Sequence, residues 1–260
     1  MKIERIPILH ITEEGEANTE TTVTMEFSLT IILNNRELVT LLCSPTDLEY
    51  LAVGFLFSEG LLKSKGEIKK ITVDDQKGVV RVETKKGKEL PLELLHKPLI
   101  ASGGGKGASF YSIAATKGWA KVESQVVIAP HEVFELVNEF QRHSQLFQET
   151  HGVHSAALCD NKNILVFNDD LGRHNAIDKI FGECILKDIP TDDRIVITTG
   201  RVPSEQLIKV AKKNVPIMIS LTVPTDLGVK LADDFGITLI GSVKGKRMNV
   251  YTNKWRVVAK

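Results

Sequence analysis

Polar side chains able to bind a ligand or take part in catalysis are densest at residues 168–179, which read Asn-Asp-Asp-Leu-Gly-Arg-His-Asn-Ala-Ile-Asp-Lys. The run connects a predicted strand to a predicted amphipathic helix. More functional side chains meet here than a connecting turn needs, which indicates a site. In a structural alternative, Asn175 caps the helix and Asp178 completes a capping-box-like exchange. Asp170 would then pair locally with Arg173.

A second polar run, Thr198–Glu205, follows a predicted strand and opens a predicted helix. Ligands of α/β sheets bind beyond the carboxyl ends of strands, and a helix N-terminus beside the Arg201 guanidinium favours phosphate. In the structural alternative, Pro203 only starts the helix and Arg201 is a solvated charge.

A third run, Gly241–Arg247, is a basic, glycine-containing turn after an apolar stretch. Lys244, Lys246 and Arg247 beside flexible backbone amides suit a diphosphate group. The spacing is not that of a Walker motif, and basic turns are also common surface features without a ligand.

Imidazole and carboxylate groups suit zinc or iron, so a metal-dependent hydrolase or deaminase is an alternative function. Its candidate ligands are His151, His154, Asp170 and His174. Their spacing fits no metal motif, and histidines near strand ends are more often hydrogen-bonded structural groups. We therefore expect no metal.

The sequence holds three cysteines and no Cys-x-x-Cys pair. Cys159 and Cys184 lie in apolar patterns and are expected in the core. Cys43 precedes a predicted helix start, where the helix dipole would stabilise a thiolate, so it is the one candidate for reactivity. An odd number of scattered cysteines suits a reducing, cytoplasmic compartment.

Length and charge set limits on the class of protein. The chain has 260 residues, with 33 Lys plus Arg against 33 Asp plus Glu, so its formal net charge is zero. No global field would attract nucleic acid or an anionic membrane, and no apolar leader is present. The pattern predicts a β-rich domain with one helix over 1–100, a flexible Gly-rich loop and linker over 101–124, and an α/β domain over 125–260.

Hydrophobic periodicity predicts the elements that would position these runs. In the first domain we expect a hairpin around Asn34-Asn35, a helix from Pro45 and two further strands at 68–73 and 79–82. In the second we expect a helix from Val133, strands at 155–159, 164–167, 194–198, 217–221 and 237–240, and helices at 176–186, 204–213 and 226–235.

Taken in order, these motifs resemble the formate dehydrogenase accessory (FdhD/NarQ) family. The resemblance covers residues 26–251 and rests on the segments 44–60, 123–125, 152–158, 170–179, 199–205 and 223–225. It implies a small β-rich N-terminal domain followed by a cytidine-deaminase-like, three-layer α/β/α domain. Several ordered motifs are far more specific than any one of them.

The resemblance also implies a function. Family members are cytoplasmic, homodimeric sulfur carriers that take persulfide sulfur from a cysteine desulfurase. They pass it to bis-molybdopterin guanine dinucleotide before that cofactor enters formate dehydrogenase. On this sequence the implied cofactor-binding residues are Ser242, Val243, Lys244, Gly245, Lys246 and Arg247, together with Gly200, Arg201, Arg173 and His174.

The chain departs from the family pattern at the sulfur-carrying loop. The family reads Cys-Gly-x-Cys-Gly, and here Gly103 and Lys106 stand at the two cysteine positions. Neither can form a persulfide, so the nucleophiles of a sulfurtransferase are missing. Smaller departures are His151 in place of a glycine and Lys244 in place of an arginine. A cofactor-binding accessory protein is the first hypothesis, and the metal-dependent enzyme and a non-catalytic interaction module follow it.

Overall fold

A computed structural model describes residues 3–85 and 120–259. The first of these ranges contains six strands and one α-helix: β1 (Ile3–Thr12), β2 (Gly15–Thr24), β3 (Phe27–Leu33), β4 (Arg36–Cys43), α1 (Leu48–Ser58), β5 (Ile68–Asp74) and β6 (Val79–Thr84). The predicted hairpin, helix and pair of strands are all confirmed. Of the Gly-rich loop and linker predicted over 101–124, residues 101–119 lie outside the described residues, so the predicted domain boundary stays a prediction.

Strands β3 to β6 form one sheet, in the order β4-β3-β6-β5. Its inner face is built by alternation, because Leu29, Ile31 and Leu33 of β3 are buried while the residues between them are more exposed. The β3–β4 connection is tight because Asn34 and Asn35 both adopt positive φ angles, of 47° and 66°. Helix α1 packs its apolar residues on this sheet.

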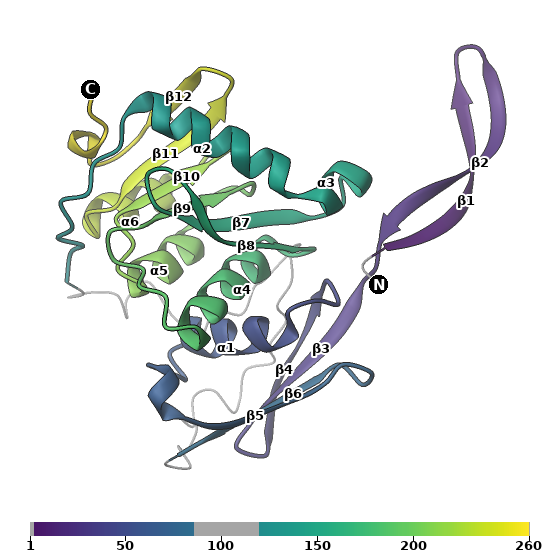
Figure 1. The fold of residues 1–260 in the computed structure, drawn as a ribbon, viewed down its shortest axis with the longest axis horizontal. Helices are drawn as coiled ribbons and strands as arrows, with labels where there is room; N and C mark the ends of the chain where they lie inside the picture. Colours follow the sequence, from purple (N-terminus) through teal and green to yellow (C-terminus); the bar gives the residue numbers. More distant parts are fainter. Residues whose placement is uncertain (1–2, 86–119, 260) are drawn as a thin grey trace.

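The β1–β2 ribbon was not predicted. Its ten-residue strands pair along their whole length and extend away from the rest of the protein (Figure 1). Leu9 is 52% and Ile11 68% exposed near its tip. A hydrophobic pattern cannot reveal such a ribbon, because neither of its faces packs on a core formed by the described residues.

The second described range forms a six-stranded sheet of order β12-β11-β10-β9-β7-β8. Helix α2 covers one face, and α4, α5 and α6 cover the other (Figure 1). This confirms the three-layer α/β/α arrangement. The elements are α2 (Pro130–His143), α3 (Gln145–Thr150), β7 (His154–Cys159), β8 (Ile164–Asp170), α4 (Arg173–Leu186), β9 (Ile195–Thr198), α5 (Ser204–Lys212), β10 (Ile217–Ser220), α6 (Asp226–Asp234), β11 (Thr238–Lys244) and β12 (Arg247–Val250).

Two of these elements, α3 and β12, were not predicted. β12 pairs antiparallel with β11, so the predicted basic turn is the connection of a hairpin at the edge of the sheet. Within the described ranges, no helix combines the length and apolar character needed to cross a bilayer.

Helices α1 and α4 join the two sheets, and glycines set their separation. A Cβ on Gly54 would lie 1.8 Å from the backbone oxygen of Asp178, and one on Gly182 would lie 1.9 Å from that of Tyr50. Real Cβ atoms do not approach backbone oxygen so closely. The two helices therefore touch through their backbones, and this crossing holds α4 and the polar run at its start against the first sheet.

We predict that Gly54→Ala lowers the free energy of unfolding by about 3 kcal/mol or more, because the added methyl forces α1 and α4 apart. Chemical denaturation monitored by circular dichroism measures this change. Gly66→Ala is the control, since a Cβ there meets only the Ser64 hydroxyl at 3.5 Å. Equal stabilities for the two variants would contradict the close crossing.

Candidate functional site

Much of the polar run at residues 168–179 is a buried structural network. Asp170 and Lys179 are both 0% exposed, and Lys179 Nζ lies 2.8 Å from Asp170 Oδ2. The Ser44 amide donates to the same carboxylate at 3.1 Å, and Ser44 Oγ accepts from the Leu171 amide at 3.1 Å. The run is thereby fixed to the end of β4, which lies more than a hundred residues earlier in the sequence.

The local capping interpretation of this run is wrong. Helix α4 begins at Arg173 with Gly172 at its N-cap, so Asn175 does not cap it. Asn175 Nδ2 instead donates to Leu42 O at 2.9 Å and to Asp170 Oδ1 at 2.8 Å. Asp170 pairs with Lys179 rather than with Arg173. The partner on β4 is a main-chain oxygen far away in the sequence, so the residues next to Asn175 could not predict this contact.

Asp178 also takes part in long-range contacts rather than in a capping exchange. Its carboxylate accepts from Ser58 Oγ at 2.6 Å and from Lys209 Nζ at 2.5 Å. These bonds tie α4 to the end of α1 and to α5. In the segment 170–179, Asp170, Asn175, Asp178 and Lys179 are buried. Arg173 and His174 are the polar residues of this segment that remain partly exposed.

Arg173 and His174 lie where the N-termini of α4 and α5 come together. Gly200 packs on Arg173, because a Cβ on this glycine would lie 3.0 Å from Arg173 Cβ. His174 Nε2 lies 3.6 Å from Glu205 Oε2. Burial, with the nearby Lys209 and Arg173 cations, lowers the pKa of His174 to about 3, so its imidazole is neutral at pH 7. Arg201 is exposed beside them.

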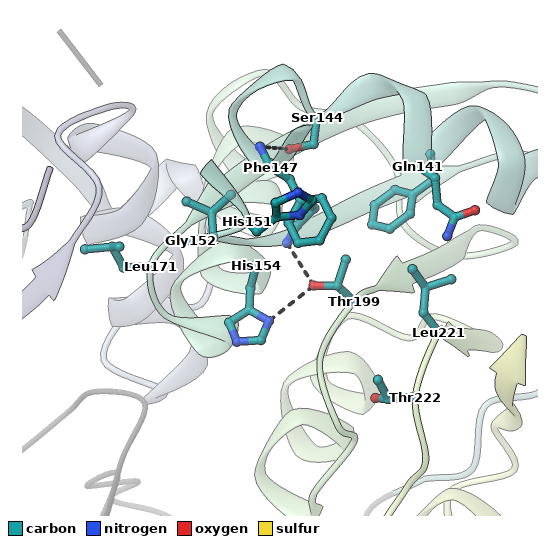
Figure 2. A pocket seen from close by; sticks show the side chains of 13 residues that line it. Gln141, Ser144, Phe147, His151, Gly152, His154, Leu171, Thr199, Leu221 and Thr222 are labelled. Carbon is teal, nitrogen blue, oxygen red and sulfur yellow. Dashed lines mark hydrogen bonds between the residues drawn. The ribbon is translucent and has the colours of Figure 1, made fainter. Parts of the chain in front are cut away.

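A cavity of about 520 Å³ opens at the same edge of the sheet, between the ends of β7, β9 and β10 and helices α2 and α3 (Figure 2). Its walls are largely apolar. His154 Nδ1 lies 3.2 Å from Thr199 Oγ1, which also accepts from the Ser155 amide at 3.1 Å. Burial, with the Arg173 charge, lowers the pKa of His154, so this imidazole is also neutral at pH 7.

Ser155 also lines the cavity. It is 2% exposed, and its Oγ has no hydrogen-bond partner among the described residues. Ser155 shares its strand face with Ala157 and Cys159, which pack toward α2, so it belongs to the α2 side of the sheet. A buried hydroxyl without a partner is costly unless a ligand or water pairs with it.

The basic turn lies next to this cavity. The Ser242 amide donates to Thr222 O at 2.8 Å, and Thr222 lines the cavity. Both Ser242 and Gly245 have positive φ angles, of 55° and 59°, at the bulged end of the β11–β12 hairpin. The exposed residues of the turn are Lys244, Gly245, Lys246 and Arg247, whereas Val243 is buried in the core. The three predicted polar runs thus all reach the same edge of the sheet, at the carboxyl ends of β8, β9 and β11.

All three cysteines are buried, and the prediction of a reactive Cys43 is wrong. Cys43 ends β4, while α1 begins only at Leu48. Burial and the Asp170 charge raise the pKa of Cys43 to about 12. Burial likewise raises the pKa of Cys184 to about 12 and that of Cys159 still further. The positions of Gly103 and Lys106 lie outside the described residues.

The proposed metal ligands are not brought together. In the part of the chain that the structure describes, no three His, Cys, Asp or Glu side chains gather to hold a metal ion. Asp170 is committed to Lys179, and His154 contacts Thr199. Within residues 3–85 and 120–259, His151, His154, Asp170 and His174 therefore do not form the cluster that a metal-dependent hydrolase or deaminase would need.

We predict that no thiol of the native protein reacts with Ellman's reagent at pH 8, because each is buried and protonated. Unfolding in guanidinium should expose all three. The released thionitrobenzoate is counted by absorbance. A rapid stoichiometric reaction of the native protein would contradict the burial of Cys43.

Comparison with known proteins identifies the family. The FdhD/NarQ family model matches residues 24–258. "Sulfur carrier protein FdhD" of Bacillus pumilus is 40% identical over 251 residues, covering 96% of each chain, and that of Bacillus subtilis is 41% identical over 246 residues, covering 94% of each. A crystal structure from Desulfotalea psychrophila, provisionally described as a formate dehydrogenase accessory protein, matches with a TM-score of 0.80 at 27% identity over 99% of this chain and 100% of that one. With its fold, ordered motifs and sequence all in agreement, this chain belongs to the FdhD/NarQ family.

Proposed function

We propose that this protein binds bis-molybdopterin guanine dinucleotide as cargo for a formate dehydrogenase and does not itself carry persulfide sulfur. The observation that carries the proposal is the meeting of a largely apolar cavity with a basic turn at one edge of the sheet. A guanylated cofactor offers both a planar ring and a diphosphate. The Desulfotalea psychrophila structure, described as a formate dehydrogenase accessory protein, supports the link to that dehydrogenase, whereas the relatives' name, sulfur carrier, describes the part of the activity for which this chain lacks the groups.

The cavity suits the ring of such a ligand. Ligand sites generally combine apolar walls with a few polar groups that set orientation. Here His154, Ser155 and Thr199 are those groups, and the neutral state of His154 avoids placing a buried charge against a neutral ring. The Ser155 hydroxyl, which lacks a partner among the described residues, can bond a polar ring edge.

The loops beside the cavity suit the phosphates. Lys244, Lys246 and Arg247 project from the β11–β12 turn, and Ser242 fixes the start of that turn to the cavity wall. Arg173 and Arg201 lie by the N-termini of α4 and α5, where unpaired amides and the helix dipole favour anions. The cationic side chains would bind the phosphates, and the apolar walls of the cavity would bind the ring.

Sulfur transfer is the part of the family activity that this chain lacks the groups to perform. A persulfide forms only on a thiolate that can reach its donor. The three thiols are buried with raised pKa values, and glycine and lysine occupy the two expected cysteine positions. The protein would therefore hold the cofactor for delivery. This role requires neither a desulfurase nor a second copy of the chain.

Calorimetric titration with GDP, which carries the guanine ring and diphosphate, tests the proposal. We predict selective binding of GDP over ADP and about a tenfold loss of affinity in Arg247→Ala, because a charge-assisted phosphate contact is removed. Arg36→Ala is the matched control, an exposed arginine at the start of β4 in the other sheet. Failure of the wild type to bind GDP at about millimolar concentration would reject the cofactor site and favour a non-catalytic interaction module.

A further inference from the structure

Two aromatic rings stand together at the wall of the cavity, on and just after the short helix α3 (Figure 2). Phe147 belongs to α3, and His151 is the residue that ends it. Their ring centroids are 5.1 Å apart, with an interplanar angle of 84°. The His151 amide donates to Phe147 O at 2.8 Å. Both side chains are exposed, Phe147 by 36%.

His151 holds its ring in an unfavourable backbone conformation. Its φ of 52° and ψ of 14° place it in the left-handed region, which glycine adopts without strain and which most other residues avoid. Glycine would end α3 equally well by this criterion. The imidazole of His151 thus stands on the wall of the cavity at a position where the family pattern has a glycine.

The segment that carries His151 is fixed from both sides. Thr150 Oγ1 donates to Leu146 O at 2.6 Å and accepts from the Gly152 amide at 3.1 Å. Thr24, at the base of the β1–β2 ribbon, donates to Gly152 O at 3.4 Å. The Phe147 end is fixed by its amide, which donates to Ser144 Oγ at 3.0 Å. These bonds hold the backbone that carries the two rings.

We propose that His151 is a specificity-determining residue. With Phe147 it forms an edge-to-face aromatic pair on the cavity wall, here called the clamp, and the planar ring of the bound ligand packs against this pair. Stacking and edge contacts with aromatic side chains favour flat heteroaromatic rings over aliphatic groups of the same polarity. Ser155, whose hydroxyl has no partner in the described chain, lines the same cavity. The inference rests on the proposed function and adds the group that selects the ring.

Stopped-flow dissociation of a ribose-labelled fluorescent GDP from the full-length protein tests the clamp. His151→Asn is the decisive variant, because asparagine tolerates a positive φ and carries no ring. We expect it to release the nucleotide about five- to tenfold faster, since one aromatic contact is lost. Its affinity for inorganic pyrophosphate, which has no ring, should equal that of the wild type. His151→Gly should behave as His151→Asn does and melt no lower than the wild type.

The matched control is His131→Asn, an exposed histidine at the opposite end of α2 from the cavity, which should release the nucleotide at the wild-type rate. Wild-type release from His151→Asn would overturn the clamp and leave the cofactor site standing. An equal loss of pyrophosphate affinity would also overturn it, because His151 would then act on the whole site. If the wild type binds no GDP, both the proposed function and the clamp are rejected.

Discussion

The buried ion pair between Asp170 and Lys179 is the interaction on which the rest of this structure depends. Two charges without solvent contact are tolerated only when every remaining polar atom is paired, and removing one partner typically costs about 3–5 kcal/mol. Here the Ser44 and Gly172 amides and the Asn175 side chain complete the carboxylate, and Asp169 O completes the ammonium. The pair joins the end of β4, the end of β8 and the start of α4.

This constraint explains why binding groups and structural groups alternate in one motif. Lys179 and Asp178 fix the position of α4 through their buried ion pairs. Arg173 and His174, at the beginning of this helix, consequently stay at the edge of the sheet. The cavity is formed at the same edge but on the α2 side of the sheet. The first sheet thus contributes to the site by fixing its frame, while the second supplies the groups that would meet a ligand.

The sequence was sufficient for elements whose apolar residues pack on a core, such as α1, α2 and the strands of the second sheet. It was insufficient where the determining contacts are distant. Asn175 looked like a helix cap because its partner Leu42 O is far away in sequence, and Cys43 looked reactive because the burial beneath α1 was not visible. The described residues bury neither face of the β1–β2 ribbon, so its strands show no clear hydrophobic pattern. Helix α3 has only 6 residues, which is too short for a helical period to be recognised. Thr199 lies in a run predicted to bind a ligand, but Ser155 was missed as a cavity residue because a small hydroxyl side chain carries no pattern of its own.

The central claim is that this member of the FdhD/NarQ family lacks a thiol that can carry sulfur. Intact-mass analysis after incubation with a cysteine desulfurase and cysteine tests it most directly, with the Gly103→Cys/Lys106→Cys double variant as the positive control. We predict that the wild-type mass stays unchanged while the double variant gains persulfide sulfur. Persulfide on wild-type Cys43, Cys159 or Cys184, formed without unfolding, would contradict the account.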